Sequence, residues 1–108
     1  MAKAARWAWA RGVAADVVAG AARMPAPGWE EAAVCRSLPD DWSPDWWFPE
    51  VPHVPEEVRA ACDRCPVRRE CLIAAYLGAE TYGVWGGLTP DQRSRALAPA
   101  KAARRVAA

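Results

Sequence analysis

The sequence is short of large aliphatic side chains: only six of its 108 residues are Leu or Ile, and one is Phe. A chain of this length fits one small domain, and small domains bury proportionally little surface. Alanine, with 25 copies, adds little bulk, so the seven tryptophans must supply much of the apolar volume. Such a chain usually needs a metal, a disulfide set or a partner to complete its stability.

Long hydrophobic runs are also missing. No stretch approaches the roughly 18 apolar residues of a membrane span, and Arg11 and Asp16 interrupt the N-terminal region before it reaches the length of a secretory signal. We therefore expect a soluble, cytoplasmic protein that makes no membrane contact and whose thiols are reduced. The single histidine, His53, lies among prolines, where we expect surface placement and not metal ligation.

The net charge is only +1, but it is unevenly distributed. Residues 29–57 hold eight acids and one base, whereas residues 58–108 hold nine bases and four acids. A basic C-terminal tail suggests an anionic partner, of which nucleic acid is the commonest, and a merely solvated tail is the alternative.

Neither a repeat nor an alternating strand pattern is visible, so the sequence predicts an all-α fold. Residues 2–23 are rich in alanine and predict a helix, which we expect to pack weakly. Residues 29–36 predict a short helix with Cys35 near its end. Five prolines make residues 37–55 an irregular connector, whose aromatic side chains should fold back onto the domain.

Three further helices are predicted in the second half. The first runs from Pro55 to about Arg64, and the next starts at Pro66 and carries Cys71. Thr89 and Gln92 have the spacing of a capping box, which predicts a short helix ending at about Leu97.

The four cysteines are the candidate functional residues. Cys62, Cys65 and Cys71 form a local triplet around the junction of two predicted helices, and Cys35 is the only candidate for a fourth ligand. Helix N-termini and nearby arginines favour thiolates, and an iron–sulfur cluster, a zinc ion or disulfides could each use this set. A redox dithiol at Cys62 and Cys65 lacks the strand context of that motif. The spacing alone does not choose between the cluster, zinc and disulfides.

A second motif follows, Gly83-Val84-Trp85-Gly86-Gly87. The cysteine spacing, this turn and the stretch from Leu88 to Arg93 together resemble the WhiB-like family of actinobacterial regulators, over about residues 29–98. The domain division that follows is an Ala-rich extension at 1–28, a WhiB-like domain at 29–98 and a short basic tail at 99–108.

The resemblance implies a small helical bundle wrapped around a [4Fe-4S] cluster held by Cys35, Cys62, Cys65 and Cys71. It implies a non-enzymatic transcription regulator that responds to redox conditions or nitric oxide and acts with the principal sigma factor. Trp85, Gly86 and Gly87 would form the sigma-facing surface, an interpretation also favoured by the tight turn and its aromatic. A core position for Trp85 is the alternative. Trp46, Trp47 and Phe48 would cover the cluster.

The tail lacks the glycine-flanked arginine pair of a minor-groove hook, so we expect only weak or assisted DNA contact. The candidate phosphate contacts are Arg93, Arg95, Lys101, Arg104 and Arg105. Two alternative functions remain, namely a thiol-disulfide oxidoreductase of the apo form, which could carry a disulfide, and a zinc-stapled interaction module.

Overall fold

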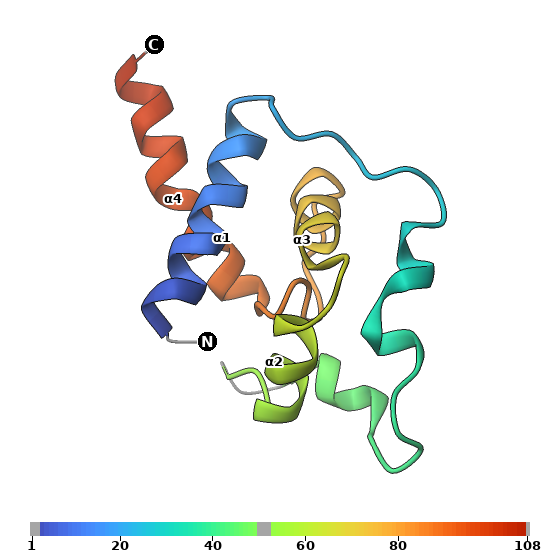
Figure 1. The fold of residues 1–108 in the computed structure, drawn as a ribbon. Coiled ribbons are helices and arrows are strands. Elements are labelled where there is room, and N and C mark those ends of the chain that lie inside the picture. Colours follow the sequence, from blue (N-terminus) through green and yellow to red (C-terminus); the bar gives the residue numbers. More distant parts are fainter. Residues whose placement is uncertain (1–2, 50–52, 108) are drawn as a thin grey trace.

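The computed structural model describes residues 3–49 and 53–107, and every element in these two segments is a helix (Figure 1). One antiparallel bridge, between Trp85 and Leu88, is the only strand-like pairing in the described chain. The all-α prediction is confirmed. In chain order the elements are α1 (Lys3–Val18), the 3₁₀ helices η1 (Trp29–Ala32), η2 (Val34–Arg36) and η3 (Pro44–Trp47), then α2 (Glu56–Asp63), α3 (Arg68–Leu77) and α4 (Pro90–Ala107).

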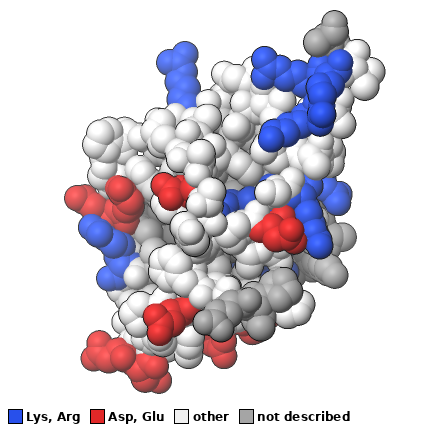
Figure 2. Space-filling view, turned by 180° about the vertical axis from the view of Figure 1, so that it is seen from behind, with Lys and Arg blue, Asp and Glu red and all other residues white. Residues whose placement is uncertain are grey.

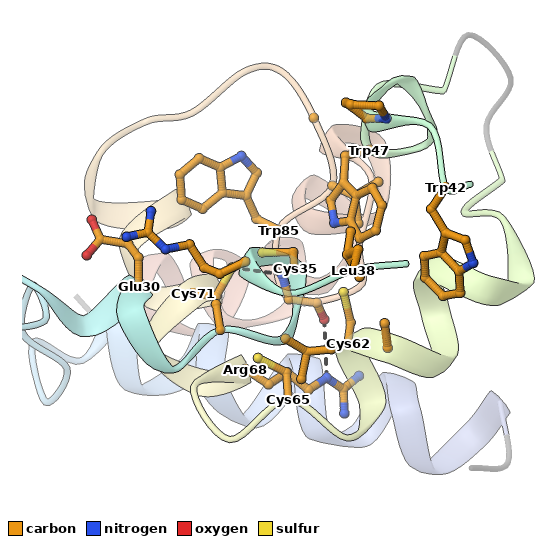
Figure 3. Close-up of a pocket in the computed structure, with 18 of the residues that line it drawn as sticks. Glu30, Cys35, Leu38, Trp42, Trp47, Cys62, Cys65, Arg68, Cys71 and Trp85 are labelled. Carbon is orange, nitrogen blue, oxygen red and sulfur yellow. Dashed lines mark hydrogen bonds between the residues drawn. The ribbon is translucent and has the colours of Figure 1, made fainter. Parts of the chain in front are cut away.

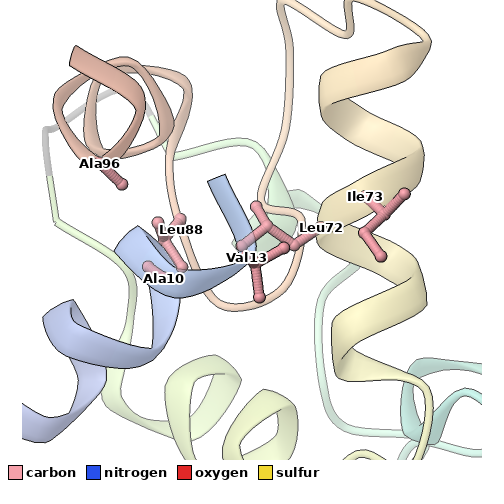
Figure 4. Close-up of a cluster of buried hydrophobic side chains, with 6 residues drawn as sticks. All are labelled: Ala10, Val13, Leu72, Ile73, Leu88 and Ala96. Atoms are coloured by element: carbon pink, nitrogen blue, oxygen red, sulfur yellow. The ribbon is translucent and has the colours of Figure 1, made fainter. Parts of the chain in front are cut away.

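Helix α1 is part of the core, so the expectation that it packs weakly is wrong. Ala10, Val13 and Ala14 are no more than 3% exposed. Ala10 and Val13 pack with α3, with the segment before α4 and with α4 itself, through Leu72, Ile73, Leu88 and Ala96 (Figure 4). The small side chains of α1 let its backbone approach its neighbours closely, so alanine here replaces the missing aliphatic bulk.

Helix α4 begins as predicted and ends later than predicted. The Gln92 amide donates to Thr89 Oγ1 (3.2 Å), and the Thr89 amide donates to Gln92 Oε1 (2.9 Å), which is the reciprocal capping box. The helix then continues through Pro99 to Ala107 instead of stopping near Leu97. Its alanines favour helix, and its far end is anchored because Arg104 Nη1 donates to the Val18 carbonyl at the end of α1 (2.9 Å).

The described part of the proline-rich connector, residues 37–55, is irregular as predicted and carries only η3. The single short helix predicted for residues 29–36 is instead the two 3₁₀ helices η1 and η2. At η3, the Ser43 hydroxyl accepts the Asp45 amide (3.2 Å), with Pro44 at the first helical position. Trp46 and Trp47 then fold back against a second buried cluster, formed by Val54, Val58 and Val84. In Figure 1, the segment that follows α1 passes around α3 and brings η3 beside α2.

The charge asymmetry of the sequence is also spatial. Figure 2 shows several lysine and arginine side chains at the end of the molecule that carries the C-terminal part of α4, both signs of charge across the middle, and acidic side chains at the opposite end. Over the described residues, no helix combines the length and the apolar character needed to cross a membrane.

Candidate metal centre

All four cysteines line one cavity of about 630 Å³, although they come from separate parts of the chain (Figure 3). Cys35 lies on η2, Cys62 lies in the last turn of α2, Cys65 lies in the short link that follows, and Cys71 lies one turn into α3. The link is tight because the Cys65 amide donates to the Cys62 carbonyl (3.1 Å) and the Arg68 amide donates to the Cys65 carbonyl (3.2 Å). The structure therefore brings together the four residues that the spacing selected.

Four cysteine thiols around one cavity are a donor set that an iron–sulfur cluster or a zinc ion can use. Within residues 3–49 and 53–107, no three His, Cys, Asp or Glu side chains are grouped closely enough to hold one metal ion. A zinc ion bound by four sulfurs at about 2.3 Å would draw the cysteines into such a group. Iron–sulfur clusters also take four cysteine thiolates but hold them further apart. The donor set therefore admits a cluster.

The four cysteines are free thiols, and burial favours the protonated form of Cys35, Cys62 and Cys71. Burial, reinforced by repulsion from the neighbouring cysteines, raises the pKa of Cys62 to about 12. Burial also raises the pKa of Cys71 to about 11, against a hydrogen bond that favours its thiolate. Burial raises the pKa of Cys35 as well. A metal centre must displace these protons, so binding would be coupled to proton release.

The hydrogen bond to Cys71 comes from the glycine-rich turn. The Gly86 amide donates to Cys71 Sγ at 3.2 Å. Amide hydrogen bonds to ligating sulfurs stabilise negative charge on a cluster and tune its potential. The residue next to Trp85 is therefore in direct contact with a candidate ligand, which spacing along the chain could not reveal.

Two glycines of the turn are required by close packing. Gly86 and Gly87 have φ values of 62° and 83°, in the left-handed region that favours glycine. A Cβ on Gly86 would lie 3.0 Å from the Leu72 Cβ on α3, and a Cβ on Gly87 would lie 3.2 Å from the Cys62 Cβ. Both glycines are buried. They shape the turn against the cysteine site and offer little surface to a partner.

Trp85 is the member of the predicted partner surface that remains accessible. Its side chain is half-buried, lines the cavity beside the cysteines, and donates from Nε1 to the Tyr82 carbonyl (3.0 Å). Trp85 is absent from both buried clusters, so it does not act as a core residue there. Next to it, Tyr82 is 78% exposed and Phe48 is 62% exposed.

The aromatic cover differs in part from the prediction. Trp47 and Phe48 line the cavity and Trp46 does not, although Trp46 and Trp47 both pack against the cluster of Val54, Val58 and Val84. Trp42 and Trp29 line the cavity instead. The Trp42 ring is tilted against those of Trp46 and Trp47, by 43° and 36°, with centroids 5.4 and 6.4 Å apart. The cluster of tryptophans in the connector was visible in the sequence, but not which rings face inward.

Arg68 is the principal positive charge held at the cavity. Its side chain is 7% exposed, its Nε donates to the Gly86 carbonyl (3.2 Å), and its Nη2 forms an ion pair with Asp63 (3.2 Å). Burial lowers the pKa of Arg68, and the Asp63 carboxylate opposes this change. Arg36 also lines the cavity, whereas Arg64 is exposed and Arg69 pairs with Asp16 on α1. Of the three arginines near the triplet, only Arg68 reaches the site.

Arg93 is not available as a phosphate contact, and that prediction is corrected. Its side chain is 3% exposed, because Nη1 donates to the carbonyls of Gly83 (2.8 Å) and Leu88 (3.0 Å) and Nη2 donates to that of Glu80 (3.0 Å). Arg93 thus fastens the turn to α4. Nothing in the sequence marked this burial, because the carbonyls that Arg93 meets come together only in the folded turn. The other candidates, Arg95, Lys101, Arg104 and Arg105, are exposed.

Comparison with known proteins identifies one family. A family model described as "Transcription factor WhiB" matches residues 29–96, which is more than half of the chain. Among individual relatives, the probable transcriptional regulator WhiB7 of Mycobacterium tuberculosis (strain H37Rv) is 49% identical over 51 residues, which is 47% of this chain and 55% of that protein. This chain therefore spans little more than half the length of that relative.

Longer matches exist among Streptomyces coelicolor proteins. Its transcriptional regulator WhiB is 38% identical over 68 residues, covering 63% of this chain and 74% of the relative. The transcriptional regulator WhiD of the same organism is 35% identical over 87 residues, covering 73% of this chain and 78% of that relative. The family match contains all four cysteines and the glycine-rich turn and leaves out α1.

Proposed function

Because this chain belongs to the WhiB family of transcription factors, we propose that it regulates transcription through a [4Fe-4S] cluster bound by Cys35, Cys62, Cys65 and Cys71. The state of the cluster would control whether the surface around Trp85 can bind the principal sigma factor. One observation carries the proposal: the four cysteines line a single cavity, and one of them accepts a hydrogen bond from the turn that presents Trp85.

The proposed link between cluster and partner is a short chain of contacts. A bound cluster supplies a redox-active, gas-reactive centre whose charge depends on its state. Gly86 is hydrogen-bonded on both sides of the peptide unit: its amide donates to Cys71 Sγ, and its carbonyl accepts from Arg68 Nε. Any displacement of Cys71 therefore acts on the residue that follows Trp85. Arg93 holds the other end of the same turn through the Gly83 and Leu88 carbonyls.

The partner surface would combine an aromatic anchor with a basic helix. Trp85 and Phe48 line the cavity, and the exposed Tyr82 is joined to Trp85 by the hydrogen bond from Trp85 Nε1 to its carbonyl. Aromatic anchors commonly dominate interface energies. Arg95, Lys101, Arg104 and Arg105 on α4 remain as candidate DNA phosphate contacts. So few charges give salt-sensitive binding of low sequence specificity, which suits a regulator that assists a sigma factor already at a promoter.

The cluster is tested by its composition. Protein purified without oxygen should be coloured and contain iron and acid-labile sulfide in equal amounts, and each Cys→Ser variant should lose both. A colourless protein with stoichiometric zinc and no sulfide would refute the proposal and favour the zinc-stapled module.

The partner surface is tested by Trp85→Ala in cluster-loaded protein. We expect the variant to keep the cluster and to lose co-purification with the principal sigma factor. Trp29→Ala is the matched control, because Trp29 is also half-buried and lines the same cavity from η1. If Trp85→Ala loses cluster and fold together, Trp85 is a structural residue and not a partner contact.

The raised thiol pKa values argue against an oxidoreductase. Reactive dithiols depend on a lowered thiol pKa, whereas burial raises that of Cys62 to about 12. Apo protein should therefore fail to catalyse insulin reduction, and turnover abolished by Cys62→Ser would reverse this conclusion.

A further inference from the structure

Helix α1 lies outside the family match, yet it reaches the wall of the cysteine cavity. The contact is made by Trp9, whose ring lies 3.7 Å from the Arg68 guanidinium carbon in a cation–π arrangement. Arg68 lines the cavity beside Cys62, Cys65 and Cys71.

A second contact from α1 meets the same arginine through a carboxylate. Arg6 Nη2 donates to Asp63 Oδ2 (3.4 Å), and Asp63 Oδ1 forms the ion pair with Arg68 Nη2 (3.2 Å). Asp63 is the last residue of α2 and follows Cys62 directly. Trp9 and Arg6 therefore constrain the Arg68 side chain from a face and from an edge.

From Arg68 the contacts lead to a candidate ligand. Arg68 Nε donates to the Gly86 carbonyl, and the Gly86 amide donates to Cys71 Sγ. We infer that α1 is a positioning element of the cluster site, and that Trp9 sets the lifetime and the reduction potential of the cluster by holding Arg68 on Gly86. This inference rests on the proposed cluster and extends it to a helix that the family match does not include.

The expected direction follows from charge. A fixed guanidinium and a well-placed amide both stabilise added negative charge on the cluster and its sulfurs. Trp9→Leu removes the aromatic face, so Arg68 becomes mobile and the Gly86 hydrogen bonds lengthen. The reduction potential should fall, and the visible absorption of the cluster should decay about tenfold faster in air, in line with a desolvated cation–π contact.

A matched control is present on the same helix. Trp7 is also half-buried and packs against the same core cluster as Trp9, but the cation over its ring is Arg11, whose guanidinium carbon lies 5.9 Å from the ring centroid. Trp7→Leu should lower the unfolding temperature by an amount similar to Trp9→Leu and leave the potential and the decay rate unchanged. Trp9→Phe keeps an aromatic face and should restore most of the wild-type behaviour. Equal decay rates and potentials for Trp7→Leu and Trp9→Leu would overturn the inference.

Two further measurements separate this inference from the proposed function. If Trp9 acts through Arg68, the effects of Trp9→Leu and Arg68→Lys on the decay rate should be less than multiplicative in the double variant, and multiplicative effects would contradict the relay. In labelled apo protein, Trp9→Leu should shift the Gly86 amide resonance and Trp7→Leu should not. An unshifted Gly86 amide overturns the inference even if the wild-type protein proves to hold no cluster, so the two failures are distinguishable.

Discussion

Replacement of Arg93 by methionine tests how the glycine-rich turn is held. The guanidinium makes three hydrogen bonds, of 2.8, 3.0 and 3.0 Å, to the carbonyls of Gly83, Leu88 and Glu80. Burial lowers the pKa of Arg93, but an arginine remains charged in proteins. Methionine keeps much of the apolar stem and removes every donor.

The magnitude can be worked from these bonds. Hydrogen bonds from charged groups contribute about 1.5–3 kcal/mol each, and they do not add fully. Loss of all three removes the Arg93 donor from the buried Gly83 carbonyl, whereas the Leu88 carbonyl keeps the Trp85 amide and Glu80 is exposed. Arg93→Met should lower the free energy of unfolding by about 3–5 kcal/mol. Small domains have only about 5–15 kcal/mol in total. The variant should therefore be partly unfolded at moderate temperature.

Arg95 supplies the control for this measurement. It lies two residues further along α4, is exposed, and forms an ion pair with Asp91 (3.1 Å). Such surface pairs contribute about 0.3–0.5 kcal/mol. Urea unfolding followed by circular dichroism should thus separate the two variants clearly. A cost below about 1 kcal/mol for Arg93→Met, or one equal to that of Arg95→Met, would refute the buried role of Arg93.

Three other predictions concern the turn, the thiols and alkaline pH. Gly87→Ala should destabilise the fold by about 1–2 kcal/mol, because φ is 83° and the new Cβ meets Cys62 at 3.2 Å; Gly12→Ala, with open space around it, should instead raise the unfolding temperature. The pKa of Cys62 is about 12 instead of 9.0, so in apo protein Cys62 should react with iodoacetamide at pH 8 roughly 1000-fold more slowly than an ordinary thiol. The reaction rate, followed by mass spectrometry, should keep rising up to pH 11. A rate that reaches a plateau below pH 9 would contradict this prediction. Burial raises the pKa of Tyr76 from 10.0 to about 12, so the contribution of its neutral hydroxyl to folding stability is complete below pH 10 and is lost as pH rises to 12. In thermal melts over that range, the wild-type protein should lose more stability than Tyr76→Phe. Parallel curves for the two proteins would contradict this prediction.

Local signals in the sequence predicted local structure well. The capping box at Thr89 and Gln92 is a contact between residues three apart, and both of its hydrogen bonds are present. The prolines of the connector excluded long helices there, and the structure has only 3₁₀ turns. The four cysteines were selected by spacing, and the cavity contains all of them.

Contacts between distant residues were not predictable in the same way. Ala10, Val13 and Ala14 form no strong hydrophobic stripe in an alanine-rich helix, so their burial depends on which elements they meet. Arg68 and Arg93 look like surface cations in the sequence, and only the backbone carbonyls of the folded turn explain why they are buried. Likewise, the sequence does not distinguish Trp46 from Trp42. In the structure, Trp46 packs against the buried valines and Trp42 lines the cavity.

The unequal support of the four cysteines has a consequence for the order of assembly. Cys62, Cys65 and Cys71 lie within ten residues on two helices and their link, whereas Cys35 is exposed on a 3₁₀ turn at the far side of the connector. Under the proposed function, three ligands can therefore be in place before the fourth arrives, and the closure of the long loop by Cys35 is the entropically costly step. We expect assembly of the cluster to end with ligation by Cys35 and loss of the cluster to begin with its release. The connector and its tryptophans would therefore control the closure of the whole site.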